Sequence, residues 1–562
     1  MADPEIELSR PSSDDTLDGD NIEFNDDSKK PMSPFESEKG WTDSSNDPIQ
    51  WKYLTFEMTL PRPSRILEPT PNGTPPPQEP NLKEYESPFN WSPRRKQFIT
   101  WLSCAATMIT AYAAGSYTAG DAQMQQYWGV SHVAITVGVT TFTTGFAIAP
   151  MVLAPFSEIN GRRPMFVITG CLYVILQLCC AVTRSYPGML VARFWMGCFS
   201  STFSTMVGGV VSDIYHAKDR NTAMALFSGS ALFGTGLGPL VSCFIAENTT
   251  WRWIFYLQII SCGVVQAVVV LFFKETRGSV LLSRKAKKLN QYYDALEEAG
   301  YYCLDVPSPS DPSKVKSMRI RWKVKADEER ASLSRSIGIS LYRPFHMLFT
   351  EPVVFFFSLW ISFAWAVLYL TFGAIPLVFT RSHNFTLSQS GAVFSAISIA
   401  AIISTILSIV AENFTKKRFP KISETPEGRL YIACGLSALL PVGLFWFGWS
   451  SFPSVPWIVP ALAIGCATMG IFSIYLAVFN YLADTYHRYA SSALAAQSFC
   501  RNMLGGVFPL VTTQMFNKMT FQGAGSFLGG VGALLTLVPF VLLIFGPRIR
   551  ARSKFASEIM EK

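Results

Sequence analysis

Long apolar segments alternate with short polar ones along most of the 562 residues of this chain. A bilayer core of about 30 Å requires roughly 20 apolar residues in a helix, and twelve segments meet that requirement. We predict transmembrane helices at Phe98 to Gly120, Val133 to Ala154, Met165 to Thr183, Gly188 to Ser212, Asn221 to Ala246, Trp253 to Phe273, Val353 to Phe379, Ser388 to Ala411, Leu430 to Trp449, Trp457 to Ala483, Ser491 to Phe516 and Gly525 to Phe545.

The predicted helices fall into two groups of six, which sets the domain organisation. Residues 91–273 form the first half, residues 351–547 the second, and the polar, basic stretch 274–350 a cytoplasmic linker. The first 90 residues are acidic and then rich in Pro, without an apolar signal sequence, so we expect a disordered tail. Residues 548–562 form a short C-terminal tail. Within the linker, residues 284–300 are predicted to form a basic helix, either solvated or lying on anionic lipid.

Sequence similarity between the halves supports this division. The pentapeptides SDIYH at 212–216 and ADTYH at 483–487 each end a predicted helix, and each precedes an Ala/Ser-rich helix that closes in Pro-Leu. Such duplication is typical of transporters whose halves are related by an axis along the membrane normal. The expected fold is an all-α integral membrane protein with twelve helices in two pseudo-symmetric halves.

Composition and charge agree with a membrane protein. Hydrophobic residues make up 49% of the chain and charged residues 15%, which excludes an ordinary soluble domain. Because positive residues are retained on the cytoplasmic side, the distribution of loop charges predicts that both termini are cytoplasmic. The net charge of +7 then reflects topology, and we expect no nucleic-acid partner. The loops on the basic side include Arg94, Arg95, Lys96, Arg162, Arg163, Arg220, Lys416, Lys417 and Arg418, against Arg184, Arg252, Arg381 and Lys518 on the other side.

Cysteine and histidine give no sign of a metal or redox site. Ten of the eleven cysteines fall within predicted helices, where they act as small packing residues. The five histidines lie in loops or at helix ends, so we expect no metal. The chain also lacks a Gly-X4-Gly-Lys-Ser/Thr loop, which leaves an ion gradient, with no bound cofactor, as the energy source.

Several motifs, in order and over the stretch from about Phe89 to Arg550, make the chain resemble one family. APFSEINGRRP at 154–164 resembles the loop between the second and third helices of the major facilitator superfamily, and LVARFWMG at 190–197 resembles its fourth-helix motif. GTGLGPL at 234–240 resembles the antiporter motif. ESPFNWSPRRK, WRWIFYLQ, KETRG, PEGRLY and NYLADTY are similar to segments of the fungal twelve-span drug:proton antiporters.

The resemblance implies roles for two of these motifs. In the family, the loop that Glu158, Arg162 and Arg163 match forms a charge relay at the cytoplasmic gate, which biases a two-state rocking equilibrium. The antiporter motif contributes Gly234, Gly236, Gly238 and Pro239, which allow close helix approach and a bend. We expect this motif to pack near the gate between the halves.

Charges inside the membrane are the main candidates for coupling, because a central Arg or Asp costs about 3 kcal/mol or more unless it is paired or hydrated. Arg193 lies roughly 7 Å inside the outer end of the fourth helix, and Asp121 ends the first helix on that side. The family fold makes these helices neighbours. We predict a coupling contact between Arg193 and Asp121; the alternative is an arginine bonded to helix carbonyls.

Arg501 is the deepest charge in the chain, about eleven residues from the inner end of its helix, with Gln497 one turn before it. In one interpretation the Arg501 side chain faces the cavity and takes part in substrate or proton coupling. In the other it has a structural role and bonds backbone carbonyls left free near Gly505, Gly506 and Pro509. No Asp, Glu or His lies at a comparable depth, which disfavours polycationic substrates. Aromatic and soft side chains suit polyspecific cavities, and the candidates on cavity-facing helices are Tyr112, Tyr117, Trp360, Trp365, Tyr369, Phe472, Tyr475, Phe479 and Asn480.

The sequence and the resemblance together predict a proton-coupled transporter that exports amphipathic small molecules by alternating access. We expect a plasma-membrane protein, with the vacuolar membrane as the alternative, that works as a monomer because twelve helices complete one pathway. A proton-coupled importer and a non-transporting sensor stay open as alternatives. An enzyme is not expected, since no nucleophile, base and orienting partner share one depth.

Overall fold

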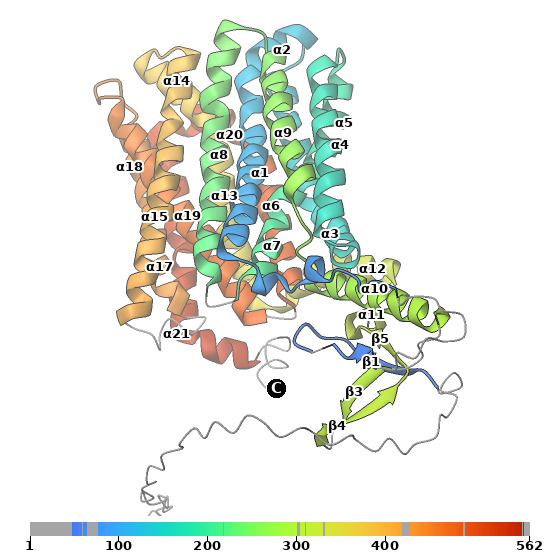
Figure 1. The fold of residues 1–562 in the computed structure, drawn as a ribbon. Coiled ribbons are helices and arrows are strands. Elements are labelled where there is room, and N and C mark those ends of the chain that lie inside the picture. Colours follow the sequence, from blue (N-terminus) through green and yellow to red (C-terminus); the bar gives the residue numbers. More distant parts are fainter. Residues whose placement is uncertain are drawn as a thin grey trace, which may run out of the picture. The chain divides into compact units, whose positions relative to one another are not determined.

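The computed structural model describes residues 48–58, 60–63, 77–216, 219–299, 304–308, 311–329, 332–418, 428–486, 489–552 and 555 (Figure 1). Most of the predicted N-terminal tail, at 1–47, 59 and 64–76, lies outside these described residues. The same holds for 553–554 and 556–562 of the C-terminal tail and for the basic positions Lys218, Lys421 and Arg488.

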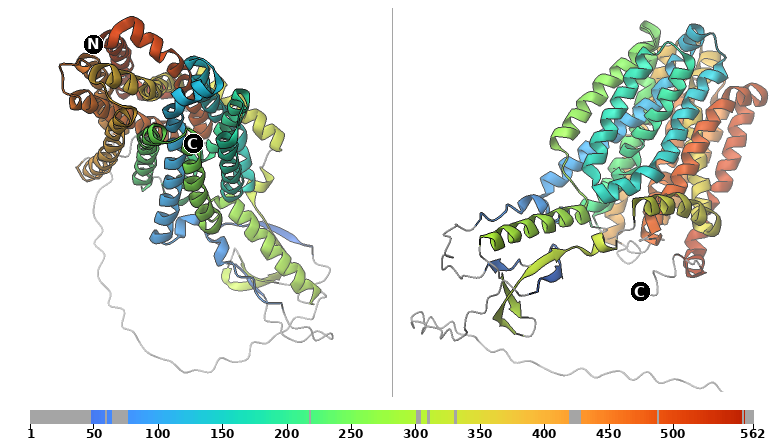
Figure 2. Two further views of the ribbon diagram at one scale, coloured as in Figure 1. Left: turned by 90° about the horizontal axis from the view of Figure 1, so that it is seen from above. Right: turned by 90° about the vertical axis from the view of Figure 1, so that its right-hand side faces the viewer.

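Two bundles of long helices form the membrane part, and Figure 2 shows the first half, blue to green, beside the second, orange to red. The first half contains α1 (Pro93–Ser116), η4 (Tyr117–Gly120), α2 (Asp121–Trp128), α3 (His132–Asn160), α4 (Arg162–Val182), α5 (Tyr186–Ser200), α6 (Thr202–Thr205), α7 (Val207–Ile214), α8 (Arg220–Asn248) and α9 (Arg252–Phe272). The second half contains α13 (Pro352–His383), α14 (Leu387–Val393), α15 (Ser395–Arg418), α17 (Gly428–Ser437), α18 (Leu439–Ser450), α19 (Ile458–Tyr486), α20 (Ala490–Leu535) and α21 (Leu537–Arg552).

Ten helices among the described residues are long and apolar enough to cross a membrane, and two features explain the difference from the predicted twelve. The predicted fourth helix is broken into α5, α6 and α7 by short turns, so no single piece reaches the required length. The predicted eleventh and twelfth helices run together as one stretch of 57 residues. That stretch breaks at Thr520, whose φ of 63° and ψ of 170° are not helical. The break lies in the predicted loop between the two helices.

The linker and part of the N-terminal segment form a small folded unit, which the sequence did not predict. Strand β1 (Gln50–Tyr53) pairs in parallel with β5 (Ile320–Lys323), and β2 (Arg62–Pro63), β3 (Leu304–Ser308) and β4 (Asp311–Met318) form an antiparallel sheet. The helical elements of this region are η2 (Lys83–Tyr85), η3 (Pro88–Asn90), α10 (Gly278–Glu298), α11 (Lys325–Glu328) and α12 (Leu333–Thr350).

An apolar cluster explains why this unit folds. Leu54, directly after β1, packs with Leu289 and Tyr293 of α10 and with Trp322 of β5, and all four are buried. The predicted basic helix is therefore present as α10, but its apolar face covers a sheet. The expectation of disorder over the whole of 1–90 is wrong for the described residues before α1, because long-range contacts order a segment whose composition alone does not.

Ion pairs between α10 and the β5 region also stabilise this unit. Arg319 and Arg321 each place a guanidinium nitrogen 2.9 Å from the carboxylate of Glu297. Burial of this carboxylate opposes ionisation, but the hydrogen bonds from the two arginines outweigh it and lower the pKa of Glu297. Glu297 therefore stays ionised at neutral pH and holds the strand against the helix.

Helix α8 contacts both halves through the predicted antiporter motif. A Cβ at Gly234 would collide with the carbonyl oxygen of Met108 on α1, and one at Gly238 would collide with that of Tyr112. On the other side, a Cβ at Gly236 would lie 2.7 Å from the Ser398 hydroxyl of α15. Gly234 and Gly238 therefore allow α8 to pack closely against α1 within the first half. Gly236 allows α8 to pack closely against α15 of the second half. The prediction of close helix approach is confirmed.

We expect Gly234→Ala to destabilise the protein by about 1–3 kcal/mol, because the new methyl group meets main-chain atoms that cannot rotate away. Gly263→Ala is the matched control, since the space around a Cβ at Gly263 on α9 is open. Thermal unfolding of the two purified variants in one detergent measures the difference. Equal melting temperatures would show that α1 and α8 do not pack as closely as described.

Candidate functional site

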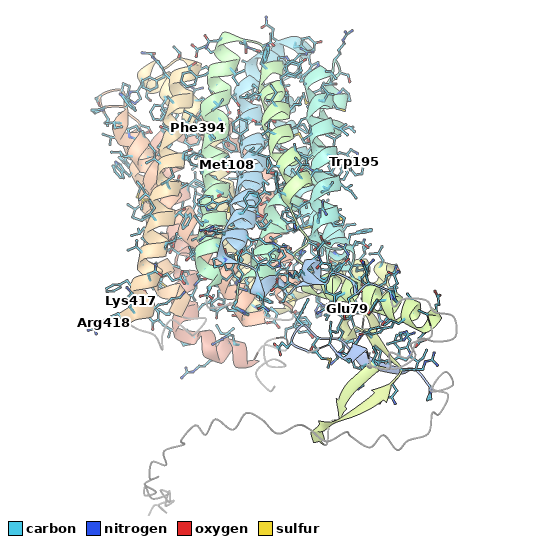
Figure 3. The ribbon with its side chains drawn as sticks, in the orientation of Figure 1. Glu79, Met108, Trp195, Phe394, Lys417 and Arg418 are labelled. Atoms are coloured by element: carbon cyan, nitrogen blue, oxygen red, sulfur yellow. The ribbon has the colours of Figure 1, made fainter. Side chains whose placement is uncertain are left out.

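The two ends of the helix bundle differ in charge, and we name them accordingly. The basic end is the end at which α4 and α8 begin, with Arg162 and Arg220, and where Lys417 and Arg418 close α15 (Figure 3). The opposite end carries α2 and α14 (Figure 1). Functional candidates lie at the basic end and in a layer of buried polar side chains between the ends.

Arg193 is fully buried on α5 and lies against aromatic rings. Its guanidinium carbon is 4.3 Å from the centre of the Tyr117 ring and 4.6 Å from that of Phe142, and its Nε donates to the Gly138 carbonyl at 3.1 Å. The other two guanidinium nitrogens have no hydrogen-bond partner among the described residues. Two residues further along, Trp195 is 49% exposed on the outer side of α5 (Figure 3). The helix thus directs its charge inward and its apolar ring toward lipid.

The predicted contact between Arg193 and Asp121 does not form in this structure. Asp121 begins α2 and has its carboxylate 3.8 Å from the His132 imidazole, an ion pair only when that histidine is protonated. Its other oxygen is buried without a hydrogen-bond partner in the described part of the chain. Tyr117 occupies the guanidinium face instead, and its hydroxyl donates to the Ile135 carbonyl. Tyr117 therefore supports Arg193 and does not join the aromatic group around Arg501.

Arg501 is 1% exposed on α20, inside a group of aromatic rings that we call the Arg501 cage. Its guanidinium carbon lies 4.6 Å from the ring centre of Trp365 on α13, and 5.0 Å and 5.8 Å from those of Tyr475 and Phe479 on α19. Among the residues described, the Ser498 hydroxyl accepts a hydrogen bond from Arg501 Nη2 at 3.5 Å. The other two guanidinium nitrogens of Arg501 have no hydrogen-bond partner there. The sequence-predicted candidates Trp365, Tyr475, Phe479 and Arg501 thus come together.

Other buried polar atoms surround the cage. Both amide atoms of Gln497, one turn before Arg501, lack hydrogen-bond partners in the described structure, as do the Trp365 indole nitrogen and the Tyr475 hydroxyl. Buried polar groups are normally bonded. A group of unmet donors and acceptors lined by rings is the composition expected of a site that binds a small amphipathic molecule.

Two residues connect the cage with the first half. Tyr369 of α13 has its ring centre 6.3 Å from that of Trp365 and packs against Phe372, whose ring lies beside Gly115 of α1. Phe227 of α8 packs its ring 6.3 Å from the rings of Tyr475 and Phe479. The cage therefore borders the interface between the halves, where rocking would change its walls.

The remaining cavity candidates lie elsewhere. Tyr112 is buried against α8, and Trp360 stacks on Phe357. Phe472 is buried on the face of α19 that carries Tyr475. Asn480 lines a separate cavity of about 80 Å³ between α8, α15, α17 and α19. The structure does not bring these four side chains into the Arg501 cage.

The basic end holds an ion-pair network, although not with the predicted acid. Arg162 is buried and pairs with Asp213 of α7 at 3.2 Å, and Arg277 pairs with the second oxygen of that carboxylate, also at 3.2 Å. Glu158 is exposed and forms no ion pair among the described residues. We call Arg162, Asp213, Glu275 and Arg277 the gate network. The assignment of Glu158 as its acid is wrong because the last turn of α3 directs that side chain to solvent.

Glu275 fixes the backbone of the gate network. Its carboxylate accepts from the backbone N–H groups of Arg162 at 2.8 Å, Arg163 at 3.2 Å, Thr276 at 3.0 Å and Arg277 at 2.9 Å. Gly161 makes this possible, since its φ of 102° suits glycine and a Cβ there would collide with the Glu275 carboxylate. Arg163 is exposed and takes part only through its backbone. Sequence reasoning quoted the motifs that contain Asp213 and Glu275 but gave neither residue a role.

Polar contacts join the halves near both ends of α8. At the basic end, Arg220 of α8 pairs with Asp484 of α19 at 3.0 Å, and the Asn221 amide donates to Glu412 of α15 at 2.7 Å. At the opposite end, Glu247 of α8 accepts from the backbone N–H of Ser388, in the first turn of α14. These residues were not predicted, because each contact joins segments more than 100 residues apart.

Comparison with known proteins identifies the family. The model of the Major Facilitator Superfamily matches residues 97–509. The chain belongs to this superfamily. It is 31% identical over 477 residues to the MFS-type transporter paaT of Penicillium rubens, which covers 84% of this chain and 83% of the relative. The multidrug transporter mdrA of Aspergillus fumigatus is 30% identical over 84% of this chain and 74% of its own.

The solved structures agree on the fold. The proton:xylose symporter XylE bound to 6-bromo-6-deoxy-D-glucose superimposes with a TM-score of 0.55 at 15% identity, over 81% of this chain and 96% of its own. The major facilitator fold and the predicted resemblance to fungal efflux transporters are confirmed. The protein is a multi-pass membrane transporter.

We expect Asp213→Asn to reduce transport at least tenfold while leaving expression intact, because it removes the shared anion of Arg162 and Arg277. Glu158→Gln is the matched control, since it removes the same charge from an exposed position in the last turn of α3, at the same end of the bundle. Substrate efflux from cells with equal surface levels of the two variants gives the comparison. A larger loss in Glu158→Gln would contradict the assignment of the gate network.

Proposed function

We propose that this transporter is a proton-coupled exporter of amphipathic small molecules that carry an aromatic or apolar body and a hydrogen-bond acceptor or anionic group. The observation that carries the proposal is the Arg501 cage, a buried cation among aromatic rings with unmet donors at the interface of the halves. Rings accommodate varied apolar bodies by area, and the guanidinium group orients an acceptor. Efflux transporters among the relatives support the direction of transport.

The same site disfavours a polycationic substrate. Such a substrate requires a buried carboxylate partner, whereas the described residues around Arg501 supply only a cation, rings and neutral polar groups. A second cation brought beside Arg501 would be repelled in a low-dielectric environment. An acceptor or a carboxylate on the substrate would instead satisfy the unpartnered guanidinium nitrogens.

Coupling is assigned to Asp121 and Arg193 at the opposite end. Asp121 is 15% exposed, so a proton from that side can reach it, and it lies one turn beyond Tyr117, whose ring the Arg193 guanidinium covers. The ionised Asp121 carboxylate attracts the Arg193 guanidinium group away from Tyr117. Protonation of Asp121 removes this attraction, and the guanidinium group returns to the Tyr117 ring. Arg193 is thus paired with Asp121 in one arrangement and with Tyr117 in the other. Protonation of Asp121 favours the second arrangement and so shifts the rocking equilibrium between the two halves.

Orientation and location follow from the loop charges. The basic end is placed on the cytoplasmic side, which puts the gate network inside and Asp121 outside, as a proton-driven exporter requires. Both termini are then cytoplasmic, and the plasma membrane is the expected location. One chain holds both halves and the site between them, so the proposed unit is a monomer surrounded by lipid, with protons and the substrate as its other partners and no cofactor.

Gradient-driven export is tested in yeast that lacks its own efflux pumps. We expect the protein to lower steady-state accumulation of a fluorescent amphiphilic carboxylate, and a protonophore to restore it. Arg501→Ala should abolish the effect, while Arg381→Ala, which removes an exposed arginine at the opposite end, should retain it. No change in accumulation with the protein at the cell surface would reject export and favour the importer or the sensor.

We expect Asp121→Asn to uncouple transport from the proton gradient, because an amide at this position cannot titrate. In proteoliposomes, the variant should exchange substrate down its own gradient but should not respond to an imposed pH difference. Glu247→Gln is the control, since it removes an acid at the same end and keeps an oxygen that accepts from Ser388. A pH response that survives in Asp121→Asn would place the coupling group elsewhere.

A further inference from the structure

A large basic pocket lies at the basic end and shares no residue with the Arg501 cage. It has a volume of about 420 Å³ and is formed by four separate segments: η2, the start of α1, the start of α4, and the stretch from the end of α9 into α10. Five cationic side chains and two carboxylates line it. The cations are Lys83, Arg95, Arg163, Lys274 and Arg284, and the carboxylates are Glu84 and Glu275.

The positive charge of this pocket is not neutralised within the protein. Among the described residues, none of the five cations forms an ion pair; Arg95 stacks on Trp91 at 3.7 Å, and the Arg163 and Arg284 guanidinium groups each donate to a backbone carbonyl at 3.4 Å. The Glu275 carboxylate is buried and already accepts four backbone N–H groups. Glu84 is exposed. Converging cations of this kind form a site for a multiply charged anion.

The surroundings of the pocket indicate a lipid. Leu271 on its wall is 72% exposed, and the neighbouring Phe272 is 55% exposed at the end of α9. On α1, Phe98 and Trp101 are exposed by 46% and 59%, and the Phe98 and Phe272 rings meet edge to face at 6.1 Å. The pocket is therefore continuous with an apolar surface on two membrane helices. A soluble anion gains nothing from such a surface, whereas the acyl chains of a lipid cover it.

We propose that this pocket binds the headgroup of an anionic phospholipid that bears phosphomonoester groups, with its acyl chains along Phe98, Trp101 and Leu271. Several phosphate charges match five cations better than the single charge of an ordinary diester. Basic pockets at the cytoplasmic face of membrane helices recognise phosphoinositide-type headgroups in this way.

Lipid bound here would act on the transporter through the gate. Arg163 contributes its side chain to the pocket and its backbone N–H to Glu275, which also holds Arg162 and Arg277. Lys83 and Arg284 connect the same headgroup to the N-terminal segment and to α10. The lipid would thus tie the folded linker unit to the membrane beside the gate network.

The test uses the full-length protein in neutral phosphatidylcholine nanodiscs, without substrate or gradient, so its outcome does not depend on the proposed function. Binding of a fluorescent phosphatidylinositol bisphosphate is titrated by anisotropy. We expect the double variant Lys274→Gln/Arg284→Gln to bind this lipid at least tenfold more weakly. Each basic group near an anionic membrane surface contributes about 1 kcal/mol to the binding free energy. The control Lys287→Gln/Lys288→Gln removes two exposed charges from α10 outside the pocket and should change affinity less than twofold.

Three outcomes would overturn the proposal. An equal loss of lipid affinity in both double variants, with unchanged melting temperatures, would show that the lipid is attracted non-specifically to the charge of α10. Equal affinity of the wild-type protein for the soluble inositol phosphate headgroup would identify a site for free phosphate compounds and not for a lipid. Competition by inorganic phosphate at millimolar concentration as effective as by the lipid would identify a simple anion site.

Discussion

Burial of two guanidinium groups without a carboxylate beside them is the constraint on which the central helices depend. A charged arginine at the centre of a membrane helix costs about 3 kcal/mol or more, and a desolvated cation–π contact contributes about 2 kcal/mol. Arg193 has two such contacts and Arg501 has three, all within 6 Å of a ring centre. Aromatic rings therefore stabilise both cations while two guanidinium nitrogens of each have no hydrogen-bond partner among the described residues.

The two buried cations lie in different halves of the transporter. Arg193, with Asp121 nearby, belongs to the first half, and Arg501 with its cage belongs to the second. Tyr369 packs beside Trp365 of the cage and beside Phe372, which lies against Gly115 in the first half. Charge coupling across an interface needs no continuous chain of contacts when both groups act on the same two-state movement.

Helix α8 connects the central layer with both ends of the interface. Its glycines admit α1 on one face and α15 on the other, and its polar residues meet the second half at both ends. The gate network and the basic pocket share Glu275, whose carboxylate also accepts from the backbone N–H of the pocket residue Arg163. The ion pairs and the proposed lipid pocket thus meet where α4 begins beside α7 and the end of α9, so a displacement there would change both.

The sequence by itself determined the membrane class, the position of most of the apolar helices, the two halves and the family. Apolar length and glycine spacing are local properties that the bilayer imposes on each segment separately. The same reasoning found Arg193, Arg501, Trp365, Tyr475 and Phe479, because a buried charge or a ring on an apolar helix is conspicuous in any sequence.

Only the tertiary structure decided which groups face one another. The acid of the gate network is Asp213 and not Glu158, Arg193 faces Tyr117 and not Asp121, and β1 pairs with a strand 270 residues later. Each of these depends on the rotation of one helix or strand relative to another that is distant in the chain. Hydrophobic pattern specifies which face of a helix is buried but not which neighbour it meets, because many partners bury the same area equally well.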